Sequence, residues 1–182
     1  VNIASMSGCG LSVSQPVYDS TRNVYWQVCY TSGVLFKQDY STNPATLTSY
    51  ATNTLMASAN PFGLTQDSSN LYATGRVSRE VFKIPKADPT SISVLLASGT
   101  LTGDVAFPTF LDGFVYVPYG NGVAKIDASS GTTTLITTGV QMWMCDDGAS
   151  LLFCTAVNSG GLYEINPSTN TATLRVSDLS TP

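Results

Sequence analysis

Short apolar segments, interrupted every few residues by Gly, Pro, Asn, Asp or Ser, dominate the pattern of this chain. Several of them alternate large apolar residues with polar ones, as in VLFKQ at 34–38 and LYEI at 162–165. Such alternation is typical of a strand with one face against a core. No window carries sustained helical periodicity. The pattern therefore predicts an all-β protein.

One hairpin signature recurs along the chain. Three nine-residue segments align without gaps, DYSTNPATL at 39–47, DASSGTTTL at 127–135 and NPSTNTATL at 166–174. A fourth copy, IPKADPTSISVL at 84–95, carries a small insertion. In each copy an Asp or Asn can fold its side chain onto the backbone where one strand ends, and a further strand then begins.

The spacing of the copies gives the size of the repeating unit. Each hairpin signature joins a third strand to a fourth, and two further apolar strands precede the third. Four strands therefore recur four times. The Leu residues that end the copies, Leu47, Leu95, Leu135 and Leu174, are 48, 40 and 39 residues apart. One propeller blade takes about 40 to 50 residues. The sequence thus predicts a β-propeller of four four-stranded antiparallel blades, rather than a sandwich or an irregular solenoid.

The order of the repeat resembles that of a known superfamily. Apolar strand, Asp turn, Leu/Val-Tyr, Gly, apolar-Lys/Glu-Ile, Asp/Asn and Thr-Leu follow one another over about residues 13–177. This order is similar to the YVTN, NHL and quinoprotein-like β-propellers. The resemblance implies a fold and no activity, because these repeats host lactonases, dehydrogenases, receptors and scaffolds. The chain has no WD dipeptide, YWTD run or tryptophan-docking repeat that would assign a subfamily.

Four blades leave open how the ring closes. We expect blades at about 13–52, 60–98, 105–138 and 140–177, within a propeller domain over 13–182. The chain could close alone, pair with a second copy, or belong to a longer protein, and a self-contained unit is favoured. Residues 1–12 form an N-terminal segment whose VNIASM run could close the ring or pair with another subunit.

Composition narrows the classes of partner. Only 11% of the 182 residues are charged, against a typical figure of about 25%. Eight scattered basic residues and a net charge of −4 give no patch for phosphates, so nucleic acid is not expected as a partner. The apolar runs are too short for membrane insertion. The 22 Ser and 23 Thr residues supply an uncharged polar surface that suits a secreted protein.

The four cysteines form no CxxC pair, and the chain has no His to complete a zinc site. Two disulfides in an oxidising exterior are favoured, with buried free thiols as the alternative. Cys9 precedes the first inner strand and Cys29 ends the strand beside it, so we expect these two to pair. A Cys145–Cys154 bridge is less expected, because a tight turn would place Cys154 opposite Met142.

Ligands of propellers usually bind on the face that carries the blade-to-blade crossings. The loops that join second and third strands lie on that face. Their candidate ligand- or partner-binding residues are Tyr30, Arg76, Arg79, Tyr119, Asn121 and Asn158. Tyr and Arg are frequent interface anchors, whereas Gly and Asn in these loops could serve turns alone. Trp26, Trp143 and Met142 lie in strands and are expected in the core.

An Asp series marks the first turn of each repeat: Asp19, Asp67, Asp112 and Asp146. Calcium takes six to eight oxygen ligands, so a ring of carboxylates could bind it. Turn formation is the favoured reading, because each Asp is followed by turn residues. Asp146 and Asp147 are a weak candidate cation site, and calcium is the only cofactor that the sequence leaves open.

Catalytic signatures are lacking. Without His there is no Ser-His-Asp or Cys-His arrangement, and there is no GxSxG elbow. Glu164 aligns with Lys37, Lys83 and Lys125 as an outward strand position. We therefore expect a non-catalytic extracellular propeller, a structural, adhesive or protein- or glycan-binding module that could assemble with itself as an oligomer. The alternatives are a calcium-dependent lactonase-like hydrolase and a fragment of a larger receptor ectodomain.

Overall fold

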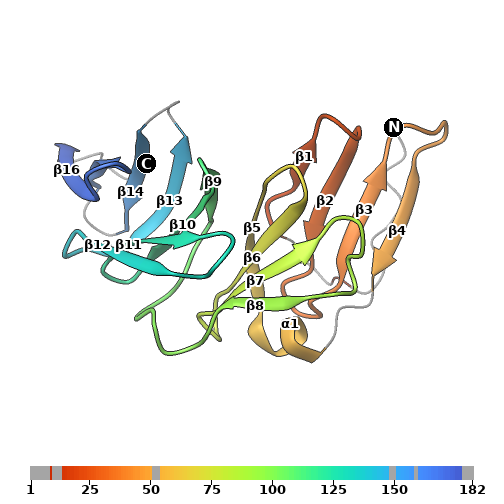
Figure 1. Ribbon diagram of the computed structural model, residues 1–182, viewed down its shortest axis with the longest axis horizontal. Coiled ribbons are helices and arrows are strands. Elements are labelled where there is room, and N and C mark those ends of the chain that lie inside the picture. Colours follow the sequence, from red (N-terminus) through yellow and green to blue (C-terminus); the bar gives the residue numbers. More distant parts are fainter. Residues whose placement is uncertain (1–8, 10–13, 51–53, 148–150, 158–159, 178–182) are drawn as a thin grey trace.

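The computed structural model describes residue 9 and residues 14–50, 54–147, 151–157 and 160–177. Within these residues the strands form four sheets of four, each made of consecutive antiparallel strands (Figure 1). The predicted fold class, an all-β propeller of four four-stranded blades, is confirmed. No helix of the described part of the chain is long and apolar enough to cross a membrane.

Each blade is a meander of four strands in chain order. The first blade comprises β1 (Val17–Asp19), β2 (Val24–Val28), β3 (Leu35–Asp39) and β4 (Thr46–Tyr50). The second comprises β5 (Pro61–Gln66), β6 (Asn70–Gly75), β7 (Val81–Pro85) and β8 (Ser93–Leu96). The third comprises β9 (Thr109–Leu111), β10 (Phe114–Tyr119), β11 (Gly122–Asp127) and β12 (Thr133–Thr137). The fourth comprises β13 (Met142–Asp147), β14 (Leu152–Ala156), β15 (Leu162–Asn166) and β16 (Thr171–Val176).

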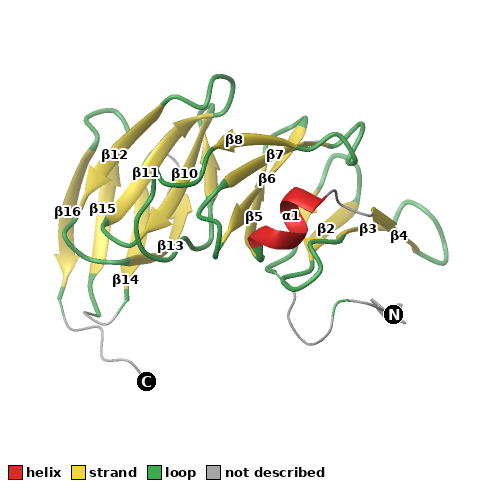
Figure 2. Cartoon of the chain, turned by 90° about the horizontal axis from the view of Figure 1, so that it is seen from below, coloured by secondary structure: helices red, strands yellow, loops and turns green. Residues whose placement is uncertain are grey.

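The four blades form an open arc. Close strand contacts join β1 and β2 to β5, β5 to β9, and β9 and β10 to β13. No comparable contact joins the first blade to the fourth among the described residues, and Figures 1 and 2 place these two blades at opposite ends of the molecule. The expected self-contained ring is therefore not what the described residues form.

Three apolar layers hold the arc together, one between each pair of neighbouring blades. Leu71 and Ala73 of β6 face the first blade, whereas Tyr72 between them faces the third. The two central blades are thus buried on both faces. Trp26 and Met142 are 1% and 0% exposed, which confirms their expected core positions.

Two lysines also reach from blade to blade. Lys83 Nζ donates a hydrogen bond to the carbonyl of Ala128 in the third blade at 2.8 Å. Lys125 Nζ donates in the same way to Pro167 in the fourth blade at 2.7 Å. The sequence reading of this repeat position as simply outward is incomplete, because its long side chain extends along the apolar layer to the next hairpin.

A short helix, α1 (Thr54–Ala59), connects the first two blades. Sequence periodicity could not reveal it, because six residues make fewer than two turns. Met56 and Ala59 of the helix are fully buried in the first apolar layer. The helix passes so close to Gly33 that a Cβ there would lie 2.7 Å from the backbone of Met56.

Both disulfides are formed. Cys9 pairs with Cys29, as the sequence predicts. Cys145 also pairs with Cys154, and the expected opposition of Cys154 and Met142 is wrong. The register sets Cys145 directly opposite Cys154 and Met142 opposite Ala156, because the pairing starts at Asp147 and Leu152 and shifts at the bulge between Met142 and Met144. The disulfides indicate an oxidising environment.

Candidate binding site

Aromatic side chains from all four blades meet in one cluster, near the first strands β5, β9 and β13, which contact one another in that order and can be followed in Figure 1. Phe62 of β5 lies 4.7 Å from Phe107 and 5.5 Å from Trp143 of β13, between ring centroids. Phe107 and Trp143 are 6.0 Å apart. Tyr30 meets Phe62 edge-on at 6.0 Å. These four residues, all half-buried, are called the aromatic cluster below.

Backbone irregularities place the cluster. Phe62 and Trp143 each lie at a β-bulge, where the pairing of β5 with β6 and of β13 with β14 shifts register. A bulge turns a side chain out of the regular alternation of the strand. Next to Phe62, Gly63 lets the third blade approach, since a Cβ there would lie 2.9 Å from Cα of Phe107. The bulges and this close approach bring the rings together.

Arg76, from the loop between β6 and β7, adds a charge to the cluster. Its guanidinium lies 5.2 Å from the ring centre of Phe62 and 5.8 Å from that of Trp143, within cation–π range. Asp104 pairs with it at 2.9 Å. The side chains of Arg76 and Asp104 remain 36% and 46% exposed. The site therefore combines an apolar aromatic floor with an orientated cation that still has access to solvent.

The predicted binding residues separate into different roles. Tyr30 and Arg76 join the site. Arg79 has a positive φ of 59° and its amide donates to the carbonyl of Gly75, so it shapes a turn. Tyr119 is only 3% exposed and belongs to the core between the second and third blades.

The other two predicted binding residues contribute less. Asn121 is exposed in the turn between β10 and β11. It belongs to none of the contacts that form the aromatic cluster. Asn158 lies outside the described residues.

Sequence reasoning missed the central part of the site. The expectation that Trp143 is a core residue is wrong: its ring lies half-buried in the cluster, because the bulge turns it away from the buried side of β13. The predicted set of binding residues also omits Phe62 and Phe107. A usable signal exists, since Phe62 and Trp143 are each the second residue of the first strand in their blades.

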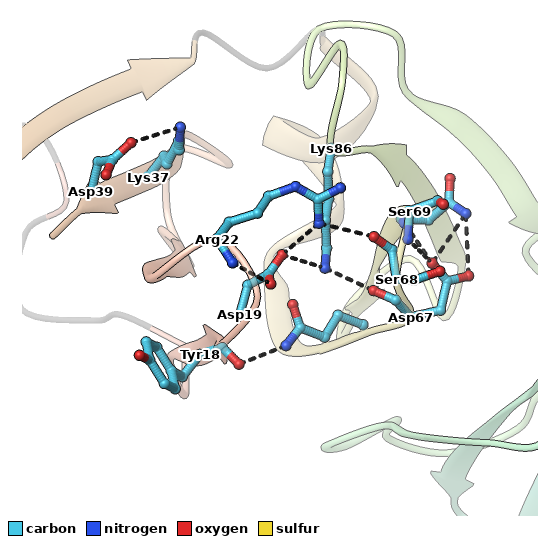
Figure 3. Close-up of polar contacts among 11 residues, drawn as sticks. Tyr18, Asp19, Arg22, Lys37, Asp39, Asp67, Ser68, Ser69 and Lys86 are labelled. Carbon is cyan, nitrogen blue, oxygen red and sulfur yellow. Dashed lines mark hydrogen bonds and ion pairs between the residues drawn. The ribbon is translucent and has the colours of Figure 1, made fainter. Parts of the chain in front are cut away.

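The Asp series lies at the opposite ends of the blades, where an ion-pair network joins the first blade to the second (Figure 3). Lys86 Nζ lies 2.9 Å from Oδ2 of Asp19, and both side chains are almost fully buried. Arg22 contacts the same carboxylate at 2.8 Å and donates to the carbonyl of Ser68. Lys86 also donates to the carbonyl of Asp67. This network ties the turns of two blades together.

The carboxylates of this network are occupied by protein donors. Burial would raise the pKa of Asp19, but hydrogen bonds from Lys86 and Arg22 lower it to about 2. For Asp67, burial again opposes the change, and the Tyr72 hydroxyl at 2.6 Å and backbone amides lower its pKa. Neither Asp has its oxygens free for a metal ion.

The calcium expectation gains no candidate set. Asp112 has a positive φ of 50° and shapes the turn between β9 and β10. Asp146 and Asp147 end β13, and their side chains lie outside what the structure describes. Among described residues, no group of three His, Cys, Asp or Glu side chains is placed to hold a metal ion.

A groove lies between the second and third blades. Asp67, Tyr72 and Lys83 contribute to its lining. Tyr72 donates to Asp67, and Lys83 donates to the carbonyl of Ala128. These polar groups already serve contacts between the blades, so the aromatic cluster is the better candidate.

The arc matches solved β-propellers. Over 93% of its length it is similar to virginiamycin B lyase from Staphylococcus aureus, with a TM-score of 0.76 and 15% sequence identity. It is also similar to a propeller in the nidogen/laminin complex (TM-score 0.69, 12% identity, 91% of this chain). A third similar structure is the WD40 domain of Neurospora crassa Pan2 (TM-score 0.65, 14% identity, 91% of this chain).

These comparisons establish the class of protein: the chain is a β-propeller. It spans 56%, 61% and 49% of those three chains, about half of each. No protein-family description and no curated protein sequence matches it. At such low identities the likeness concerns the fold alone.

Proposed function

We propose that this chain is a non-catalytic, extracellular interaction module that binds a protein partner at the aromatic cluster. The observation that carries the proposal is a partly exposed arginine that lies within cation–π range of Phe62 in the second blade and Trp143 in the fourth. Half-buried aromatic residues beside an arginine are the composition of energetic centres in protein interfaces. A peptide with an aromatic or apolar side chain next to an acidic group fits this site.

Two other features of the chain support the proposed extracellular location. Two disulfides favour an oxidising compartment, and a polar surface with few charges suits secretion. The nidogen/laminin neighbour is itself a propeller in a complex with a protein. That likeness supports a protein partner over the glycan and self-assembly alternatives for this face.

An enzymatic role has less support. One solved form of the similar lyase is a catalytically inactive variant in which alanine replaces a histidine. The present chain has no His, so it could not use the same side chain for that chemistry. The hydrolase alternative needs a calcium site, for which the described residues offer no set of ligands.

A selection experiment tests the proposal. The chain is panned against a displayed random-peptide library, a glycan array is probed in parallel, and an enriched peptide is titrated by calorimetry. Trp143→Ala and Arg76→Gln should each weaken peptide binding about tenfold or more. Leu135→Ala, which changes an exposed apolar residue of β12 outside the cluster, should leave it unchanged.

Three results would contradict the proposal. The first is an affinity for the peptide that neither Trp143→Ala nor Arg76→Gln lowers. The second is binding of glycans alone. The third is calcium binding in a calorimetric titration together with turnover of a lactone. That result would favour the hydrolase function over the proposed binding function.

A further inference from the structure

The two ends of the arc expose faces that are buried everywhere else in the molecule. The second strand of each blade carries one ring that points toward the following blade. Trp26, Tyr72 and Tyr116 occupy this position in the first three blades and are 1%, 0% and 0% exposed. Phe153 occupies it in the fourth blade and is 37% exposed. Its exposure shows where a further blade would pack.

The first blade shows the complementary face. Leu71, Val115 and Leu152 point toward the preceding blade in blades two to four, and all three are fully buried. Tyr25 takes that position in the first blade and is 39% exposed. It stacks on Tyr18 at 4.6 Å and meets Tyr40 edge-on at 5.5 Å. Cys9 packs on Phe36 elsewhere on this side of the sheet.

The contact that would join these faces already exists inside the chain. Tyr72 of the second blade stacks on Phe110 of the third at 5.7 Å with nearly parallel rings. Phe110 pairs with Val115 in the sheet, just as Tyr18 pairs with Tyr25. The repeat therefore makes Phe153 the counterpart of Tyr72, and Tyr18 the counterpart of Phe110.

The end faces differ from the internal ones in a way that favours a separately folded partner. Ile84, Ile126 and Ile165 face the preceding blade from the third strands and are fully buried. Gln38 replaces them in the first blade and is half-buried.

The fourth blade shows the same change. Glu164 replaces the lysine of the other third strands and is paired with Arg175 at 2.7 Å. Interfaces between separate chains combine polar groups with aromatic anchors. The faces that are covered inside this chain carry apolar residues at the positions that Gln38 occupies in the first blade.

We propose that two copies of this chain assemble head to tail into one ring. Phe153 of each copy packs on Tyr18 and Tyr25 of the other. Because the arc spans about half of larger propellers, a second arc completes a ring of eight blades, within the range of known propellers. A twofold axis makes the two contacts identical, and a head-to-tail contact that closes gives a finite ring.

Native mass spectrometry and sedimentation velocity over a wide concentration range test the proposal. The expected mass is twice the 19.2 kDa of one chain. Phe153→Lys and Tyr18→Glu, each checked for folding by circular dichroism, should weaken the dimer about tenfold or more. Leu135→Lys, at an exposed site of β12 away from both end faces, should not.

Mixing the two variants identifies the geometry. A head-to-tail pair of one Phe153→Lys chain and one Tyr18→Glu chain has one wild-type contact and one contact of opposite charges, so the mixture should recover the dimer. A wild-type monomer at all concentrations, a dimer insensitive to both variants, failure of the mixture to recover, or a ladder of larger species would each overturn the proposal.

Discussion

Lys86 and Asp19 show at the scale of single residues how the first two blades are held together. Both side chains are at most 5% exposed, and removing one partner of a buried pair leaves an uncompensated charge. We expect Lys86→Met to lower the free energy of unfolding by about 3–5 kcal/mol in guanidinium titrations. Lys37→Met, which breaks the more exposed pair with Asp39, should cost under about 1 kcal/mol.

Asp19 also predicts a pH dependence. Its pKa is lowered from 3.8 to about 2 in the folded chain, so the unfolded chain binds the proton more readily. The contribution of the Asp19 carboxylate to the free energy of unfolding is fully present above about pH 4 and is lost as the pH falls toward 2. Urea unfolding at pH 5 and pH 2.5 should show a smaller decrease for Asp19→Asn than for the wild type. An equal decrease in both would contradict the assignment.

Single residues were only partly predictable. The sequence predicts Tyr30 and Arg76 as binding residues because their loops recur in each repeat, and the structure places both beside Phe62. It could not identify Trp143, because a bulge reverses the direction of a side chain without changing the apolar pattern. It also could not identify the Lys86–Asp19 pair, whose partners are 67 residues apart.

At the scale of elements, the side chain of Thr74 links the second and third blades by hydrogen bonds to their backbone groups. Its hydroxyl accepts from the amide of Gly63 and donates to the carbonyl of Ala106 in the buried seam between β6 and the third blade. Thr74→Val keeps the shape but leaves two buried groups unpaired, so we expect a loss of about 1–3 kcal/mol or more in chemical unfolding. Thr137→Val on exposed β12 should change stability by under about 0.5 kcal/mol.

The disulfide between β13 and β14 allows a second prediction for an element. Cys145 and Cys154 are nine residues apart in the sequence, and their bridge restricts the unfolded chain. Replacing both by Ala should therefore lower the free energy of unfolding by about 3 kcal/mol. Differential scanning calorimetry with and without reductant measures it. The reductant should have a smaller effect on the variant than on the wild type, and an equal effect would show that this bridge does not contribute.

Elements were the most predictable level. The hairpin signature sets the strands because an Asp or Asn side chain fixes each turn locally: Asp127, for example, accepts from the amides of Ser129 and Ser130. The helix α1 escaped prediction because six residues are too few to show a period.

The whole molecule is the scale at which sequence reasoning was least complete. The repeat gives the number of blades, but the angle between neighbouring blades depends on how side chains such as Tyr72 and Phe110 fill the layer between them. The sequence therefore favoured a closed unit, while the described residues form an arc. The open ends expose the faces that a second copy would cover, and the contacts between neighbouring blades bring the rings of the aromatic cluster together.

The distances between blades test the open arc most directly. Spin labels are introduced as unnatural amino acids at exposed positions Thr48 of β4, Thr134 of β12 and Thr171 of β16, and labelled chains are diluted with unlabelled protein. Pulsed electron–electron double resonance should give a longer distance between Thr48 and Thr171 than between Thr48 and Thr134. The reverse order, with the fourth blade nearer to the first than the third blade is, would mean that the chain closes on itself and would contradict the account.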